Sequence, residues 1–257
     1  MALLSPYRNK VLTHGKWPYL ESTDETGLEF HIQILQKGES LDSFYEGRES
    51  ALLVIEGQGF IQLENKELEF SRPNWIDSPP WVLHTPDQSS GTILAKSGCK
   101  IAVVRTKNKL LFEPKIYEPS QIDVEHRGQG LLDDTCYRHV RLAFDRTVAH
   151  ENSRLVLGEV LNYPGKWSSY PPHHHPQPEI YYYEFNPPEG YGHGELGEDV
   201  YKIKHQDLLK ITHNRDHSQV AAPGYHLYYL WAIRHLDHQP YDGFEFTKPY
   251  DKLLKSN

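Results

Sequence analysis

The chain has 257 residues with 35 acidic and 27 basic side chains, so its formal net charge is −8. This acidic balance argues against a nucleic-acid-binding groove, which needs clustered Lys and Arg. Because no run of about 18 apolar residues occurs, the sequence also predicts no membrane-spanning helix. We therefore expect neither nucleic acid nor a membrane as a partner.

The N-terminal segment and the cysteine content predict a cytoplasmic protein. Only a short apolar stretch precedes Ser5 and Pro6, which is too little for the core of a signal peptide. The two cysteines, Cys99 and Cys136, are too few for a disulfide framework or a cysteine-based zinc site.

Strand-like patterns dominate the chain. Short runs rich in β-branched and aromatic residues, separated by clusters of Gly, Pro, Asn and Asp, are typical of β-strands. They predict strands at 28–36, 51–57, 59–64, 100–106, 155–162, 179–185, 207–212 and 226–233. No amphipathic pattern is long enough for a helix of ten or more residues. Many short strands between turns predict an all-β sandwich or barrel.

The strand rhythm repeats in the two halves of the chain. We therefore predict two barrels, at residues 1–120 and 121–257, with the boundary in an unpatterned stretch near 116–124. One extended sandwich is the alternative that periodicity leaves open.

The N-terminal half contains potential metal ligands without a metal-ligand spacing. His31, Glu49 and His84 lie far apart in sequence, and no two of them form a recognisable pair. We expect the N-terminal barrel to be degenerate and to lack a metal motif.

A candidate metal motif lies between residues 165 and 185. His173 and His175 are two residues apart, so in extended backbone both imidazoles point to the same side. Glu179 follows a Pro-Gln-Pro turn and opens an aromatic strand. Such a hairpin can bring two imidazoles and a carboxylate onto one divalent ion and leave positions for a substrate. A solvated histidine loop is the simpler alternative.

This H-x-H-x3-E pattern before an aromatic strand resembles the first motif of the cupin superfamily. The resemblance implies double-stranded β-helix (jelly-roll) barrels and a fourth ligand, a histidine from a later strand. His217 and His226 are the two candidates in this chain. His217 follows Thr212 and Asn214, where cupins have Pro and Gly, and His226 follows Pro223-Gly224-Tyr225.

Several further blocks resemble the 5-deoxy-glucuronate isomerase family of inositol catabolism. These blocks are Glu125-His126-Arg127-Gly128-Gln129, Trp167-Ser168-Ser169-Tyr170-Pro171-Pro172-His173-x-His175, Glu179-x-Tyr181-Tyr182-x-Glu184 and Gly224-Tyr225-x-x-Tyr228-Tyr229-Leu230. In that family the last ligand precedes the Gly-Tyr strand by several residues. The resemblance therefore implies that His173, His175, Glu179 and His217 are the metal ligands, with His226 as the alternative to His217.

The resemblance implies an aldose–ketose isomerase that converts 5-deoxy-D-glucuronate to 5-dehydro-2-deoxy-D-gluconate through a metal-stabilised enediolate. We expect one divalent ion, with Zn or Mn preferred and Fe, Co or Ni also compatible with N and O ligands. The partner is then a small anionic sugar acid, and a homo-oligomer is also considered. The alternatives are a 4-deoxy-uronate ketol isomerase of pectin breakdown, a non-catalytic sugar-binding cupin and an oxygen-using dioxygenase.

Four further residues are candidates beside the ligands. Glu159, a carboxylate in an otherwise apolar strand, and Tyr183 are candidate proton carriers. Tyr181 shares the ligand face of its strand and is a candidate substrate contact. Arg127 can hold a substrate carboxylate bidentately. The alternatives are packing for the tyrosines, a solvent-facing position for Glu159 and an inter-domain salt bridge for Arg127.

Overall fold

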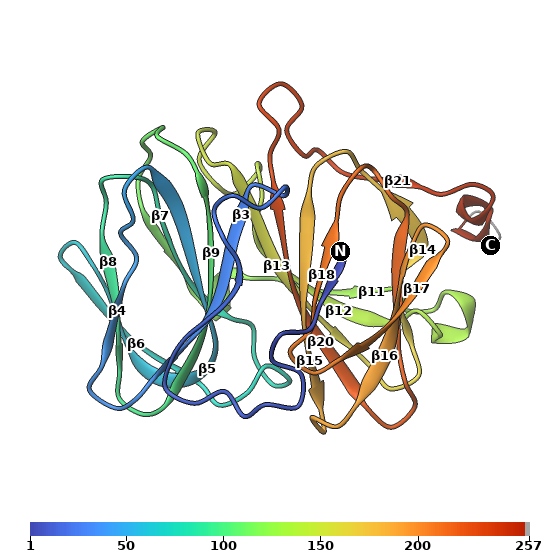
Figure 1. The fold of residues 1–257 in the computed structure, drawn as a ribbon, viewed down its shortest axis with the longest axis horizontal. Helices are drawn as coiled ribbons and strands as arrows, with labels where there is room; N and C mark the ends of the chain where they lie inside the picture. The colour runs from blue at the N-terminus through green and yellow to red at the C-terminus, as the bar shows by residue number, and fades with distance from the viewer. Residues whose placement is uncertain (255–257) are drawn as a thin grey trace. The chain divides into compact units, whose positions relative to one another are not determined.

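The computed structural model describes residues 1–254, which form an almost entirely antiparallel β structure (Figure 1). The predicted all-β class is confirmed. The helical elements within this range are three short 3₁₀ turns: η1 (Pro119–Gln121), η2 (Leu132–Asp134) and η3 (Tyr250–Leu254). None of the helices in residues 1–254 has the length and apolar character needed to cross a bilayer.

The chain forms two compact units that are interleaved in sequence. The unit that we call the C-terminal unit contains residues 1–10, 124–142 and the chain from residue 158 onward. The N-terminal unit contains residues 11–123 and 143–157. The predicted domains, 1–120 and 121–257, differ from these units in the placement of residues 1–10, 121–123 and 143–157.

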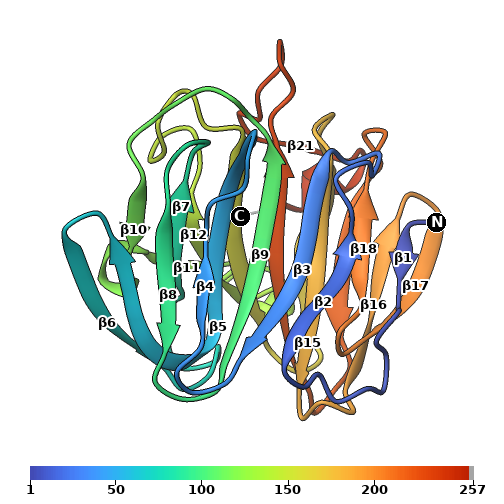
Figure 2. The same cartoon turned by 60° about the vertical axis from the view of Figure 1, so that its left-hand side comes forward.

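The N-terminal unit is a nine-stranded antiparallel assembly folded around an apolar core (Figure 2). Its strands are β2 (Gly15–Leu20), β3 (Leu28–Leu35), β4 (Ser40–Asp42), β5 (Arg48–Leu63), β6 (Lys66–Arg72), β7 (Trp81–Thr85), β8 (Gly91–Ala95), β9 (Cys99–Lys107) and β10 (Lys115–Tyr117). The first half of β5 pairs with β7 and β9, whereas its second half pairs with β6 and β8. This strand therefore belongs to both layers that enclose the core.

The continuity of β5 corrects the prediction of two strands, 51–57 and 59–64, with a turn between them. Gly57 has φ +133°, and a Cβ at this residue would lie within 3.0 Å of Cys99. A Cβ at Gly59 would also lie within 3.0 Å of a neighbour, the carbonyl oxygen of Leu94. These glycines allow close backbone approach at a bend in one continuous strand, rather than a chain reversal.

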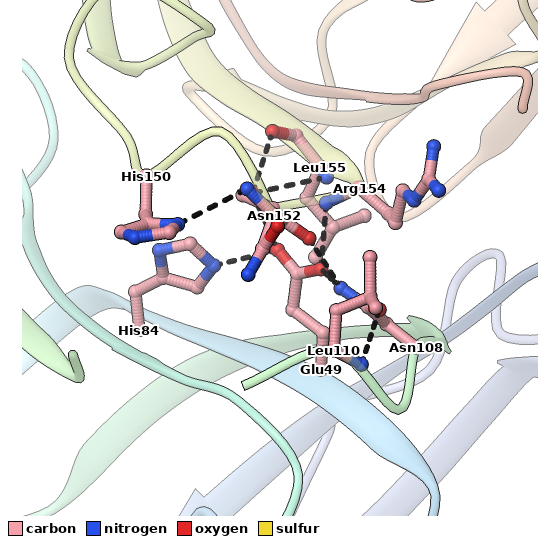
Figure 3. A network of polar contacts seen from close by, with 9 residues as sticks. Glu49, His84, Asn108, Leu110, His150, Asn152, Arg154 and Leu155 are labelled. Atoms are coloured by element: carbon pink, nitrogen blue, oxygen red, sulfur yellow. Dashed lines mark hydrogen bonds and ion pairs between the residues drawn. The ribbon is translucent and has the colours of Figure 1, made fainter. Parts of the chain in front are cut away.

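A buried polar network ties the segment 143–157 to the rest of the N-terminal unit (Figure 3). The Glu49 carboxylate on β5 accepts hydrogen bonds from His84 Nε2 at 2.7 Å and Asn108 Nδ2 at 2.8 Å. It also accepts bonds from Ser153 Oγ at 2.6 Å and from the backbone N–H of Arg154 at 2.7 Å. Four donors thus surround a fully buried charge, as the burial of a carboxylate requires.

The C-terminal unit packs a seven-stranded sheet against a five-stranded sheet. In spatial order the larger sheet contains β1 (Leu3–Leu4), β18 (Leu208–Ile211), β15 (Glu179–Asn186), β20 (His226–Arg234), β13 (Leu155–Asn162), β12 (Arg138–Phe144) and β11 (Val124–Arg127). The smaller sheet contains β17 (Asp199–Lys204), β16 (Tyr191–Leu196), β19 (His217–Ala221), β14 (Trp167–His174) and β21 (Glu245–Phe246). Residues 1–10 belong here because β1 pairs with β18.

The core of this unit contains polar as well as apolar side chains. Tyr181, Tyr183 and Tyr229 from the larger sheet pack among Leu196 and Ile203 from the smaller one. Since successive residues of a strand face opposite sides, the tyrosines at 181 and 183 share the inner face with Glu179. The predicted strand at 179–185 is confirmed, as are those at 28–36, 100–106, 155–162, 207–212 and 226–233.

We expect Glu49→Gln to lower the free energy of unfolding by about 2–4 kcal/mol at neutral pH, because it leaves buried donors around a neutral amide. Burial would raise the pKa of Glu49, but the hydrogen bonds from His84, Ser153 and Asn108 and the charge of His84 outweigh it and lower the pKa. The stabilisation of the fold by the ionised Glu49 carboxylate is therefore complete above the unfolded-state pKa of about 4.3. It is lost as the pH falls through the lower pKa of Glu49 in the folded state.

Urea unfolding of wild type and variant as the pH is lowered measures this effect, with the exposed Glu113→Gln as the matched control. The difference in the free energy of unfolding between wild type and Glu49→Gln should become smaller in acid. A difference that does not depend on pH would contradict an ionised Glu49 in this network.

Candidate metal centre

Three buried side chains of the C-terminal unit converge: His175, Glu179 and His217. One potential ligand atom of each lies within 4.8 Å of the others. Glu179 Oε2 is 3.1 Å from His175 Nε2 and 3.4 Å from His217 Nε2. Glu179 opens β15 and His217 opens β19, while His175 follows β14, so the ends of strands from both sheets meet here.

His173 lies beside this trio. Its Cα is the register partner of His217 across β14 and β19, and the two ring centroids are 4.3 Å apart. The ring of His173 lies 6.5 Å from that of His175, whereas His174 bonds to Asp216 at 2.8 Å. The structure thus brings the four predicted ligands together, with His173 next to the tightest group of three.

Backbone carbonyls fix the orientation of two of the imidazoles. His173 Nδ1–H donates to the Ser169 carbonyl at 3.2 Å, and His217 Nδ1–H donates to the Arg215 carbonyl at 3.1 Å. The Nε2 atom of each ring then carries the lone pair, as in metal-ligating histidines held by a carbonyl. Within residues 1–254, His217 Nε2 is buried without a hydrogen-bond partner. An orphaned ring nitrogen beside a carboxylate fits a cation.

The surroundings keep these imidazoles neutral. Burial, together with the neighbouring His217 and His175, lowers the pKa of His173 well below its usual value. Burial also lowers the pKa of His217, although the charge of Glu179 opposes the shift. Neutral imidazoles and a carboxylate form a donor set that accepts divalent Zn, Mn, Fe, Co or Ni. The residues therefore fit a divalent metal ion.

His226, the alternative fourth ligand, lies away from this cluster. It is the register partner of Asn186, at the other end of β15 from Glu179. Seven residues of strand separate these positions, which is about 23 Å at a rise of roughly 3.3 Å per residue. The ring of His226 packs 5.6 Å from that of Tyr163. The assignment of His226 as a ligand is therefore wrong.

A network of buried hydroxyl groups adjoins the cluster. The ring of Tyr181 lies 5.8 Å from that of His217, and its Oη is 3.5 Å from Ser169 Oγ. Ser169 Oγ is also 3.2 Å from Tyr229 Oη, and Tyr229 bonds in turn to Ser168 Oγ at 2.6 Å. Tyr181 is therefore the tyrosine with a ring contact to a proposed ligand and a hydroxyl in the network.

Tyr183 joins the same network one step further along β15. Its Oη donates to Gln219 Oε1 at 2.7 Å, and Gln219 Nε2 donates to Ser169 Oγ at 2.9 Å. Its ring contacts Tyr181 and Tyr229. Tyr183 is thus connected to Tyr181 through Gln219 and Ser169.

Glu159 faces away from the cluster. The next residue along β13, Val160, lies in the core with Tyr181, so strand alternation turns Glu159 to the other side of the sheet. There its carboxylate accepts bonds from Arg141 Nη1 and Tyr228 Oη, both at 3.0 Å. This position corrects the expectation that Glu159 carries a proton for a substrate at the cluster.

Arg127 already holds a carboxylate of the chain itself. Its Nε and Nη2 donate to the two oxygens of Glu125 at 2.8 and 2.5 Å. The Arg127 side chain is 40% exposed on β11. Because Glu125 already accepts both hydrogen bonds from this edge of the guanidinium, the structure does not support Arg127 as the residue that binds a substrate carboxylate.

Two aromatic residues near the cluster escaped the sequence analysis. The ring of Phe244 lies 4.2 Å from that of His173, and the ring of Tyr241 lies 5.0 Å from that of His175. Both belong to the segment between β20 and β21, beyond the last predicted strand. The aromatic residues of this segment are the feature of the sequence that could have indicated its contact with the cluster.

Comparison with known proteins places these features in a family. Residues 7–252 match the model of the KduI/IolB family. A 5-deoxy-glucuronate isomerase of Geobacillus kaustophilus is 28% identical, over 78% of this chain and 77% of that protein. A 5-deoxy-glucuronate isomerase of Shouchella clausii is 29% identical, over 89% of this chain and 90% of that protein.

Solved structures show the same fold. A crystal structure of an IolB-like protein from Salmonella typhimurium LT2 superposes with a TM-score of 0.85 at 19% identity, covering 99% of both chains. A cupin 2 conserved barrel domain protein from Leptotrichia buccalis gives a TM-score of 0.54 at 13% identity, covering 90% of this chain and 95% of that one. The expected cupin-like fold is thus confirmed.

We expect His217→Ala to remove most of the bound metal, because it deletes a ring nitrogen that faces Glu179. Elemental analysis of the purified protein measures this, with about one divalent ion per chain expected in the wild type. His226→Ala is the matched control and should keep full occupancy. Full occupancy in His217→Ala, or its loss in His226→Ala, would contradict the ligand assignment.

Proposed function

The chain belongs to the KduI/IolB family, and we propose that it is an aldose–ketose isomerase acting on 5-deoxy-D-glucuronate to give 5-dehydro-2-deoxy-D-gluconate in myo-inositol catabolism. The observation that carries the proposal is the buried group of His175, Glu179 and His217 in a chain whose relatives are named for this activity. The pectin-related, dioxygenase and non-catalytic alternatives are not favoured by those relatives. A cytoplasmic location and a homo-oligomer stay predictions.

We assign one divalent metal ion to His173, His175, Glu179 and His217, with Zn or Mn preferred and Fe, Co or Ni compatible. When bound, the ion would supply an electrophile for the carbonyl oxygen of the substrate and for the negative charge that develops beside it. The ligand set carries a single negative charge, so the loaded site stays cationic overall. An anionic sugar acid is thus attracted locally despite the net charge of −8.

The chain's own residues orient the ligands and limit water at the site. The carbonyls of Ser169 and Arg215 hold the rings of His173 and His217. The ring of Phe244 packs on His173 and reduces the access of water to that side of the cluster. Both effects prepare the site before substrate arrives.

Tyr181 is the residue that we propose to control a proton at the substrate. Burial, together with the negative charge of Glu179, raises the pKa of Tyr181 well above its usual value. The phenol therefore keeps its proton at neutral pH and can donate it toward a substrate oxygen as negative charge develops there. Tyr183 was predicted as a proton carrier; since its hydroxyl donates to Gln219, we propose that it positions Tyr181 through Gln219 and Ser169.

We expect the metal-loaded protein to convert 5-deoxy-D-glucuronate, with loss of the aldose signals and growth of ketose signals in the NMR spectrum. Removing the ion with a chelator should stop turnover, and re-adding it should restore the rate. Turnover of a 4-deoxy-uronate in its place would overturn the substrate assignment, and oxygen consumption would point to a different reaction.

Tyr181→Phe should lower kcat by about a hundredfold or more, because a positioned proton donor is removed without loss of ring packing. Tyr183→Phe should cost less than about tenfold, since it acts through other residues. Both variants should keep the wild-type metal content. An equal or larger loss of kcat in Tyr183→Phe would reverse the two roles.

A further inference from the structure

Arg138 places a cation inside the C-terminal unit. It opens β12, and its residue is only 5% exposed. Val140, two residues along the same strand, lies in the core with Tyr229. Because alternate residues of a strand share a face, the side chain of Arg138 points toward the same interior.

The guanidinium of Arg138 is only partly satisfied by the protein. Its Nη1 donates to the Cys136 carbonyl at 2.8 Å. Across residues 1–254 it makes no ion pair, and its Nε–Nη2 edge has no hydrogen-bond partner. Neither Nε nor Nη2 is among the fully buried polar atoms without a partner in residues 1–254, so both keep some contact with solvent.

Two other buried arginines of the chain, Arg105 and Arg141, have carboxylate partners. Arg105 pairs with Glu29 at 3.2 Å, and Arg141 pairs with Glu159 at 3.0 Å. A buried cation without such a partner is costly, which is why buried arginines are normally paired. Arg138 departs from this rule on the inner face of the sheet that carries Glu179.

Arg138 faces the interior that contains the hydroxyl network beside the histidine cluster. Val140, on the same face of β12, packs in the core with Tyr229. Tyr229 Oη is 3.2 Å from Ser169 Oγ, and the Ser169 carbonyl accepts the bond from His173 Nδ1. Burial raises the pKa of Tyr229, and the positive charge of Arg138 opposes that rise. The hydroxyl network therefore connects the interior that Arg138 faces with the histidine cluster.

We propose that Arg138 binds the carboxylate of the anionic sugar substrate through its Nε–Nη2 edge, while the other end of the sugar lies at the histidine cluster. The planar fork of a guanidinium matches a carboxylate with two parallel hydrogen bonds. The inference rests on the proposed function for the identity of the substrate. It replaces Arg127, the cross-strand partner of Arg138, whose own edge is occupied by Glu125.

The first test compares steady-state kinetics on 5-deoxy-D-glucuronate and on its neutral amide. Arg138→Gln should raise KM for the acid by about 10- to 100-fold with little change in kcat, and should reduce the preference for acid over amide by a similar factor. Arg138→Lys, which keeps the charge but loses the fork, should fall between. The exposed Arg146→Gln is the matched control and should behave as wild type.

The second test uses binding rather than turnover. Affinity of the metal-free protein for D-gluconate and for its neutral amide, measured by ligand NMR, should show a preference for the acid that Arg138→Gln abolishes. If wild type shows this Arg138-dependent preference but does not isomerise the uronate, the proposed function fails and the role of Arg138 stands.

Two results would overturn the role of Arg138 while the proposed function stands. One is an active wild type whose KM and acid preference are unchanged in Arg138→Gln. The other is an Arg127→Gln variant that carries the whole loss. If circular dichroism shows that Arg138→Gln is unfolded, Arg138→Lys decides, and an unchanged KM in that variant overturns the inference.

Discussion

The antiparallel pairing of β14 with β19 is the constraint on which the candidate metal centre depends. It places His173 opposite His217, two residues that are far apart in sequence. A slip of one residue would turn every side chain of a strand to the other face, so the cluster exists only in this register. On the facing sheet, β15 pairs with β18 and β20 and fixes Glu179 at its first position. The site is thus a consequence of sheet register.

Buried polar groups in this chain are of two kinds: those whose hydrogen-bond partners all come from the protein, and those that lack a hydrogen-bond partner. The Glu49 carboxylate has four donors, all from the N-terminal unit, and its role is to hold a segment in place. His217 Nε2 is buried without a hydrogen-bond partner in residues 1–254, and the Nε–Nη2 edge of Arg138 has none either. Because a polar group without a hydrogen-bond partner costs free energy of folding, such a group beside a candidate site favours a ligand that completes it. The Glu49 carboxylate needs no ligand, since the chain supplies all of its donors.

The sequence predicted what local spacing determines. Two histidines at i and i+2 share a face in any extended strand, and a Pro-Gln-Pro turn before Glu179 brings the carboxylate back toward them, so this part of the cluster could be deduced without a structure. Strands with dense β-branched patterns, such as 155–162, were also recognisable. The strand pairing that brings in His217 came from family resemblance and not from periodicity.

The failures arose where the deciding contact is remote in sequence. Glu159 lies in a strand that is buried on both faces, so its burial could not show which face it occupies. Arg127 and Arg138 are cross-strand neighbours on β11 and β12. Only the structure reveals that Glu125 binds the guanidinium of Arg127 and not that of Arg138. The partners of Glu49 lie on segments that no local pattern connects.

The proposed division of roles between Arg138 and the histidine cluster follows from where charge changes during isomerisation. The carboxylate of a uronic acid keeps the same charge in the ground state and in the enediolate, so a residue that binds it stabilises both equally. Groups at the reacting carbons meet charge that develops only during the reaction, and this is where we propose that Tyr181 and the cluster act. Holding both ends of the sugar fixes the two reacting carbons against the proton donor. A buried arginine at one end and a cationic site at the other can therefore divide recognition from chemistry within one barrel interior.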